Sequence, residues 1–242
     1  MNEKIIYKRE HFQALPSTND YLKEKRAAMQ RGECEKRNYI VTADYQTSGR
    51  GTKGRSFLSE EGGVYLSMLT FYQNFKSKDV FLLLAQAAVA VCETLAYYGI
   101  ESVIKWSNDI YVQDKKIAGI LIENVFCGEG VSSSVIGIGL NVTNTLSSEI
   151  KNIATSMREA MGKTYDTEEV RERLIMELQK PRSMQEYLSY IGYMNREVTL
   201  ILGDERVHGR LIFVDDSGRL HAEIDGEERC LSSAEVSISL RK

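Results

Sequence analysis

The sequence lacks the features that mark several common classes of protein. Its 242 residues carry 31 Lys and Arg against 34 Asp and Glu, so the formal net charge is −3. The basic excess that is typical of a nucleic-acid binder is therefore absent. The four cysteines and three histidines are scattered and form no C-x-x-C pair. This spacing predicts neither a disulfide framework nor a zinc site.

A secretion signal and a membrane anchor are missing from the pattern as well. The first residues, MNEKIIYKRE, are charged throughout and contain no apolar core of the kind that a signal peptide has. The most apolar run, VFLLLAQAAVAVC at 80–92, is interrupted by Gln86 and is too short to span a bilayer. We therefore predict a soluble, cytoplasmic protein with no membrane partner, in which this run is a buried core helix.

The first half of the chain alternates between helical and strand-like patterns. Ser17 or Thr18 can cap a helix that Gly32 ends. The segment NYIVTADYQ at 38–46 alternates like a strand, and a second strand-like segment, GGVYLSMLTFY, begins at Gly62. A glycine-rich loop separates the two strands.

A long helix and a series of strands follow. The helix is predicted from Ser77 to about Tyr98, with Gly99 closing it. Strand patterns with short turns then run from 101 to 142, which favours a mixed or antiparallel sheet. Residues 148–190 have a polar, helical pattern.

The C-terminal part of the chain has a different sequence pattern. From Asn195 onward, about five short strands are joined by GD, DDSG and DGEE turns, which is typical of a small SH3-like barrel. We therefore predict an α+β protein with two domains. Residues 1–190 form a mixed or antiparallel sheet flanked by helices, and residues 191–242 form the small β-barrel.

The segment TSGRGTKGRSF at 47–57 contains Gly49, Gly51 and Gly54 in the spacing G-x-G-x-x-G. Both a dinucleotide-binding turn and a P-loop require a helix to begin at the glycines, whereas here RSFLSEEGGVYL leads into a strand. Both motifs are rejected. The three cations, Arg50, Lys53 and Arg55, still allow the loop to order around a polyphosphate. Composition alone leaves a solvated surface loop as an equal alternative.

Three further segments accompany this loop. They are STN at 17–19, KWSNDIYVQDKKIAGILIE at 105–123 and GIGLN at 137–141. With YQTSGRGTKGR at 45–55, their order and spacing resemble the signature segments of the biotin protein ligases. The resemblance covers about residues 10–160, and the C-terminal strands resemble the small end domain of that family. Because STN begins at position 17, the form without an N-terminal DNA-binding domain is expected, and no DNA partner with it.

The resemblance implies a two-step reaction. Biotin and ATP give biotinyl-5′-AMP and pyrophosphate, and the biotinyl group then passes to one lysine of a carrier domain. The resemblance implies that Lys116 and Arg50 are catalytic. It also implies that the residues contacting biotin are Ser17, Thr18, Asn19, Gln46, Arg50, Gly51, Thr52, Lys116 and Gly119. The residues implied to contact the nucleotide are Arg55, Phe57, Lys105, Asn108 and Asn141.

Each of these assignments has a plainer alternative. Ser17 and Thr18 can simply cap a helix, Lys116 can be a turn lysine, and Phe57 can be a core residue. Asp109 either assists magnesium or holds its turn.

The resemblance also implies the cofactors and partners. ATP is the co-substrate and biotin the substrate, with Mg²⁺ bridging the phosphates and no dedicated protein ligands for the metal. The acceptor is the biotin carboxyl carrier protein of acetyl-CoA carboxylase or of a related carboxylase. A homodimer is possible, and the sequence does not decide the oligomeric state. The alternatives are a lipoate ligase-like acyl-adenylate enzyme and a non-catalytic module that binds biotin or a nucleotide. Lipoate has no ureido group, and retention of Lys116 together with the basic loop argues against the module.

Overall fold

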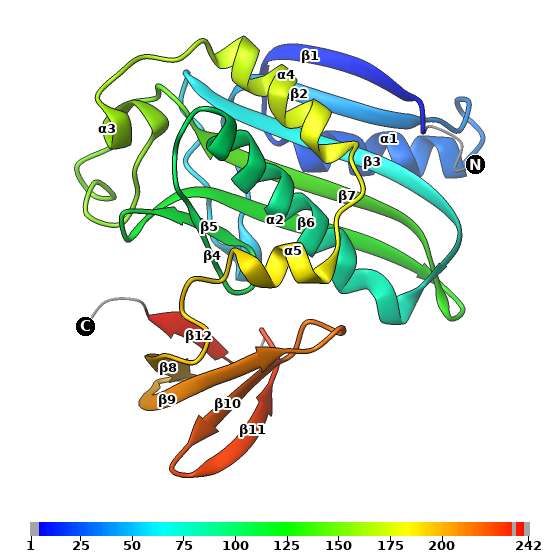
Figure 1. The fold of residues 1–242 in the computed structure, drawn as a ribbon. Coiled ribbons are helices and arrows are strands. Elements are labelled where there is room, and N and C mark those ends of the chain that lie inside the picture. The colour runs from blue at the N-terminus through cyan, green and yellow to red at the C-terminus, as the bar shows by residue number, and fades with distance from the viewer. Residues whose placement is uncertain (1–4, 234–235, 240–242) are drawn as a thin grey trace. The chain divides into compact units, whose positions relative to one another are not determined.

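The computed structural model describes residues 5–233 and 236–239. The chain forms two compact units built from interleaved segments. The first unit consists of Met1–Ser77 and Ala118–Glu172, and the second consists of Lys78–Ile117 and Arg173–Lys242. Figure 1 shows the elements in chain order. The predicted boundary between a domain 1–190 and a domain 191–242 stays a prediction.

The first unit is built on a mixed sheet. Its strands are β1 (Tyr7–Leu15), β2 (Asn38–Gln46), β3 (Gly63–Lys76), β6 (Lys115–Cys127), which enters this unit at Ala118, and β7 (Gly130–Asn141). Hydrogen-bonded neighbours follow the order β1-β2-β3-β7-β6. The β1–β2 pair is parallel and the other pairs are antiparallel, so the predicted mixed sheet is confirmed.

Helix α1 (Thr18–Gln30) packs on this sheet through its apolar side. Leu22 and Met29 of the helix form one buried cluster with Tyr39, Val41 and Leu69 of β2 and β3. Burial of such side chains contributes roughly 1.5–3 kcal/mol each, so this contact fixes the helix on the sheet. It thereby fixes the position of the helix N-terminus, where Ser17 is the N-cap and accepts the backbone N–H of Asp20.

The structure differs from the sequence analysis at two places. β1 was not predicted, because its exposed edge position leaves most of its side chains polar or charged and hides the alternation. The helical pattern predicted for 148–190 is wrong over 148–156, which forms turns, and the rest is divided among three short helices. These helices are α3 (Met157–Met161), α4 (Thr167–Leu178) and α5 (Met184–Ser189). A polar composition is compatible with turns as well as with helices, so composition could not separate the two here.

The second unit contains the long helix. A 3₁₀ turn, Ser77–Asp79, precedes α2 (Val80–Tyr97), and Gly99 follows with a φ of 75°, as predicted. The segment Ser77–Tyr97 has the length and apolar composition of a membrane span, unlike the shorter apolar run considered in the sequence. However, 61% of its most apolar window is buried inside the fold, as expected for a core helix.

Helix α2 contacts α5 and the hairpin of β4 (Val103–Lys105) and β5 (Asp109–Val112). Phe81 and Tyr187 join the two helices in an edge-to-face contact with ring centroids 5.4 Å apart. The hairpin that carries KWSND is therefore packed against a buried helix.

The second unit also contains a separate, fully antiparallel sheet. Its strands are β8 (Glu197–Leu202), β9 (Glu205–Val214), β10 (Leu220–Ile224), β11 (Glu227–Leu231) and β12 (Val236–Ser239). They lie in the order β11-β10-β9-β8-β12 (Figure 1). Gly203 and Gly226, both with positive φ, close two of the tight turns. The predicted small C-terminal β-structure is confirmed.

Candidate active site

Glycines form a floor on one face of the sheet of the first unit. Gly119 of β6 pairs with Gly139 of β7, and Gly137 lies two residues before Gly139 on the same face. A Cβ atom on Gly137 would lie 2.0 Å from Oδ1 of Asn19, and one on Gly139 would lie 2.4 Å from the ring of Phe57. Glycine is therefore required here because side chains from other elements lie directly on the strand backbone.

A buried polar cluster lies above this floor. The backbone N–H and the hydroxyl of Thr18 both donate to Oε1 of Gln46, at 2.8 and 3.0 Å. The hydroxyl of Ser67 lies 2.7 Å from Oγ1 of Thr18 and 2.6 Å from Oδ1 of Asn19. Nδ2 of Asn19 donates to Glu123 at 3.0 Å. Thr18, Asn19 and Ser67 are all at least 96% buried, so the cluster lies in a desolvated environment.

This cluster keeps capacity for a ligand. A hydroxyl has one proton and two lone pairs, and an amide oxygen has two lone pairs. Oγ1 of Thr18 donates its proton to Gln46, so its lone pairs can accept an N–H. Ser67 has one proton for two nearby acceptors, Oγ1 of Thr18 and Oδ1 of Asn19, and can donate to only one of them at a time. Ser17 is occupied as the helix cap, whereas Thr18 points into the cluster. One residue caps while its neighbour stays available.

Four charged side chains border the cluster. Arg50 forms ion pairs with Asp20, at the N-terminus of α1, and with Glu123 of β6, at 3.4 Å from the latter. Lys23 bridges the same two carboxylates, at 3.2 Å from Asp20 and 2.8 Å from Glu123. Burial opposes ionisation of Glu123, but hydrogen bonds from Lys23 and Asn19 outweigh it and lower its pKa. Glu123 is thus ionised and holds both Arg50 and the amide of Asn19.

The loop at 47–57 is folded back on itself. Arg50 and Ser56 form an isolated antiparallel bridge, and the N–H of Gly51 donates to the carbonyl of Arg55 at 2.7 Å. Arg55 also donates to Thr52, within the loop. Gly54 has a φ of 71°, which favours glycine. Of the predicted loop contacts, Gly51, Thr52 and Arg55 therefore make hydrogen bonds within the loop, and Arg50 links the loop to α1 and β6.

Phe57 and Asn141 occupy positions with clear packing roles. Phe57 is half-buried, lies over Gly139 and makes an edge contact with Tyr65 at 6.5 Å between centroids. Asn141 is buried, donates to the carbonyl of Thr155 at 3.1 Å and accepts from Asn144 at 3.0 Å. The Asn141 amide thus holds the turn segment that follows β7. The predicted contacts of both residues with a nucleotide stay predictions.

The remaining predicted residues lie in the second unit. Nζ of Lys116 is 2.7 Å from Oδ1 of Asp109, and both side chains are largely buried, with exposed fractions of 31% and 20%. Lys105 lies over the ring of Tyr111 and contacts its hydroxyl at 3.3 Å. Oδ1 of Asn108 accepts from Ser107 at 3.4 Å. Asp109 therefore orients Lys116 by an ion pair that the sequence did not predict.

The KWSND turn is anchored by aromatic side chains of the same unit. The N–H of Trp106 donates to the hydroxyl of Tyr193, and its indole N–H donates to the carbonyl of Gly218 at 3.1 Å. The hydroxyl of Tyr187 donates to the carbonyl of Ser107 at 2.8 Å. These contacts leave the turn carrying Asn108 and Asp109 little freedom to move.

Sequence patterns did not reveal several members of the site. Ser67 and Glu123 interrupt apolar strands, which is a signal for an inward polar group, and Asp20 stands three residues before Lys23 on α1. Each signal is ambiguous in isolation. Only the strand register places Ser67 opposite Gly137 and near the start of α1.

Comparison with known proteins assigns the chain to a class. A model of the biotin/lipoate A/B protein ligase family matches residues 11–141, which is more than half of the chain. The chain therefore belongs to the biotin/lipoate A/B protein ligase family. A model of the biotin protein ligase C-terminal domain matches residues 193–239. Within the family, the chain is a biotin protein ligase.

Relatives and solved structures agree with this assignment. The bifunctional ligase/repressor BirA of Escherichia coli is 30% identical over 237 residues, which cover 93% of this chain and 72% of BirA. The biotin–[acetyl-CoA-carboxylase] ligase of Mycobacterium tuberculosis is 27% identical, covering 81% of this chain and 77% of the relative. A structure of the biotin protein ligase from Aquifex aeolicus in complex with biotin and ATP matches with a TM-score of 0.76 and 30% identity. It covers 97% of this chain and 99% of that one.

Proposed function

We propose that the chain activates biotin with ATP to biotinyl-5′-AMP and transfers the biotinyl group to a lysine of a biotin carboxyl carrier protein. The observation that carries this proposal is the polar cluster above the glycine floor, in which Thr18, Asn19 and Ser67 are buried and Gln46 is half-buried. These atoms bond to one another but keep further hydrogen-bonding capacity, because a hydroxyl and an amide oxygen each have two lone pairs. A ureido ring, with two N–H donors and one carbonyl acceptor, can use that capacity, whereas the apolar headgroup of lipoate cannot.

In the first chemical step, the biotin carboxylate attacks the α-phosphate of ATP and pyrophosphate leaves. We propose that the ammonium of Lys116 holds the carboxylate against the phosphate and stabilises the charge that develops there. Its partner Asp109 fixes the approach of the side chain at 2.7 Å. Lys105, Asn108, Arg55, Phe57 and Asn141 are proposed to contact the nucleotide. In the second step, the lysine amine of the carrier attacks the acyl carbon and AMP leaves.

Mg²⁺ is proposed to enter with ATP as part of the substrate. Magnesium is usually bound through substrate phosphates and one or two carboxylates rather than through a protein cage. Asp109 is the carboxylate of the KWSND turn, and one of its oxygens is taken by Lys116. It can therefore offer Mg²⁺ one remaining oxygen, which fits an ion carried mainly by phosphates.

The proposed function is tested by incubation of the protein with biotin, Mg-ATP and a biotin carboxyl carrier domain, followed by mass spectrometry of the carrier. One biotinyl adduct on the acceptor lysine is expected, and none on a carrier whose acceptor lysine is replaced by Arg. The same assay with lipoate in place of biotin distinguishes a biotin ligase from the alternative, a lipoate ligase-like acyl-adenylate enzyme. Faster transfer of lipoate than of biotin, or tight biotin binding without pyrophosphate release, would contradict the proposal.

We predict that the loop at 47–57 becomes better protected when the adenylate binds. Ordering a residue costs about 1–2 kcal/mol, so the ligand must supply new contacts. Amide exchange at 47–57 is expected to slow with a non-hydrolysable biotinyl-adenylate analogue. Arg50→Gly removes the ion pairs with Asp20 and Glu123, so it should raise exchange and release adenylate that labels bystander lysines.

The matched control for the loop is Arg37→Gly, which removes an exposed arginine whose ion pair reaches only Glu35. This variant should behave like the unmodified protein. Equal exchange at 47–57 with and without the analogue would show that the loop does not close over the ligand.

A second prediction concerns nucleic acid. Although several relatives are named ligase/repressors, the net charge of −3 offers this chain no general attraction to DNA. We predict no sequence-specific duplex binding, and we further propose a cytoplasmic location. A mobility shift at physiological salt that persists against competitor DNA would contradict the prediction on DNA binding.

Sedimentation with and without biotin decides whether the protein forms a homodimer.

A further inference from the structure

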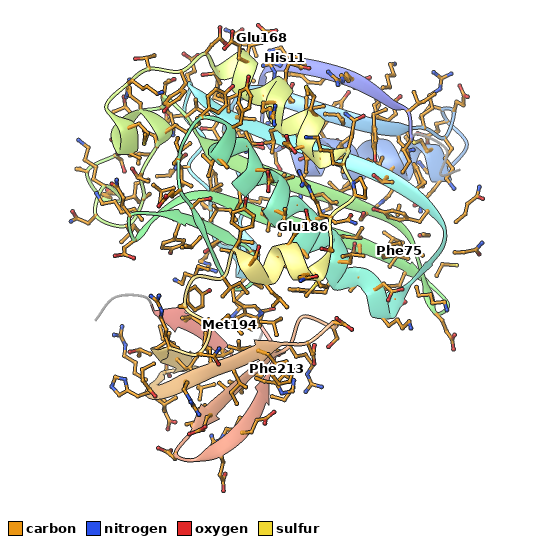
Figure 2. The ribbon with its side chains drawn as sticks, viewed as in Figure 1. His11, Phe75, Glu168, Glu186, Met194 and Phe213 are labelled. Atoms are coloured by element: carbon orange, nitrogen blue, oxygen red, sulfur yellow. The ribbon has the colours of Figure 1, made fainter. Side chains whose placement is uncertain are left out.

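Three potential metal ligands from three consecutive segments of the chain meet in the C-terminal sheet. Among the residues that the structure describes, Asp215, His221 and Cys230 place one ligand atom each within 4.8 Å of one another. Asp215 follows β9, His221 lies on β10 and Cys230 lies on β11. Figure 2 labels the neighbouring Phe213 on β9. This cluster shares no residue with the ligase site.

The strand register produces this arrangement. His221 and Cys230 are direct partners in the antiparallel β10–β11 pair, so their side chains lie on the same face. Sγ of Cys230 is 3.4 Å from Nε2 of His221, and Oδ2 of Asp215 is 3.3 Å from the same nitrogen. Two ligands bound to zinc at 2.0–2.3 Å with tetrahedral angles lie about 3.3–3.6 Å apart. The two separations from Nε2 of His221 therefore match edges of a zinc tetrahedron, and the Asp215 and Cys230 ligand atoms lie within 4.8 Å of each other.

Neighbouring groups orient two of the three ligand residues, His221 and Asp215. Nδ1 of His221 lies 2.9 Å from a carboxylate oxygen of Glu228, which is the usual outer partner of a metal-binding histidine and leaves Nε2 to face the metal. The ring of Phe213 stacks on His221 at 4.0 Å and fixes its plane. Oδ1 of Asp215 accepts the backbone N–H groups of Ser217 and Arg219, so the turn holds the carboxylate with Oδ2 toward the histidine.

We propose that Asp215, His221 and Cys230 form a binding site for Zn²⁺, with water in the fourth position. A donor set of one thiolate, one imidazole and one carboxylate suits zinc rather than magnesium or calcium. Binding replaces the thiol proton of Cys230 with the metal and releases that proton to solvent. The ion links the β9–β10 turn to β11. Gly218 of that turn accepts the indole N–H of Trp106, so the ion also steadies an anchor of the KWSND segment.

The test uses the full chain and the metal alone, because the C-terminal sheet has not been shown to fold by itself. Titration with Zn²⁺ should give one site per chain. Titration with Co²⁺ should give a near-ultraviolet thiolate-to-metal charge-transfer band. Cys230→Ser should abolish the band, and Glu228→Gln, which changes only the outer partner, should weaken Zn²⁺ binding about 10- to 100-fold. Asp215→Asn keeps the Oδ1 acceptor of the turn and should also weaken binding.

The controls are Cys34→Ser and Cys127→Ser, which remove exposed thiols outside the cluster and should leave binding unchanged. Circular dichroism checks the fold of each variant, and Glu228→Gln keeps the test valid if Cys230→Ser fails to fold. Zn²⁺ binding that is unaffected by Glu228→Gln and Asp215→Asn would overturn the proposal. Loss of the cobalt band in Cys34→Ser or Cys127→Ser would overturn it as well.

Discussion

Replacement of Lys116 by Ala is expected to slow the formation of biotinyl-5′-AMP by about 10²-fold or more, by analogy with the loss of one preorganised electrostatic group. The ammonium is absent from the variant, so nothing in its place holds the biotin carboxylate against the α-phosphate. The fold should persist, because Lys116 lies at the start of β6 and its side chain forms an ion pair rather than a core contact. Pyrophosphate release under saturating biotin and ATP measures the rate.

Two comparisons separate catalysis by Lys116 from general damage. Lys115→Ala removes the neighbouring lysine at the start of β6 and should leave the rate within a few-fold of the unmodified enzyme. Asp109→Asn should slow the reaction less than Lys116→Ala does, because the lysine is still present but is no longer oriented at 2.7 Å. The double variant should be no slower than Lys116→Ala alone, since the two residues act as one unit. Near-normal pyrophosphate release by a folded Lys116→Ala variant would contradict the assignment.

Local sequence signals predicted most of the elements that position the site. The strand at 38–46 and the closure of α2 by Gly99 follow from short-range periodicity and from the conformational freedom of glycine, which do not depend on distant residues. β1 was missed because an exposed edge strand has no strong apolar alternation. The turns at 148–156 were missed because a polar composition fits turns as well as helices. The end of this segment is held by a tertiary contact, the amide of Asn141 on the carbonyl of Thr155, which the local sequence does not show.

The site residues were predicted by resemblance, but their partners were not. The polar cluster depends on Ser67, and the ionic network depends on Asp20 and Glu123, each of which is an ordinary residue in its local sequence. The same limit applies to the C-terminal sheet. His221 and Cys230 are nine positions apart with no metal-binding spacing, and only the register of β10 with β11 makes them neighbours.

Replacement of Gly137 by Ala is expected to weaken biotin binding about 10- to 100-fold, which corresponds to roughly 1.4–2.8 kcal/mol. The added methyl would lie 2.0 Å from Oδ1 of Asn19, so the amide must leave its position against the strand. That movement breaks the contacts of Asn19 with Ser67 and Glu123 and removes polar atoms from the proposed ureido pocket. Isothermal titration with biotin measures the loss of affinity, and urea denaturation measures the accompanying loss of stability.

A double-mutant cycle shows whether the methyl acts through Asn19. In an Asn19→Ala background the colliding amide is absent, so Gly137→Ala should cost little further affinity, although Asn19→Ala alone weakens binding. Gly130→Ala is the matched control. It adds a methyl to the same strand where the nearest atom is a backbone oxygen 3.1 Å away, and it should leave biotin affinity unchanged. If the two losses of affinity are additive, the Gly137→Ala substitution acts through the strand backbone at position 137 and not through a collision with Asn19. The pocket would then have to be assigned to other side chains.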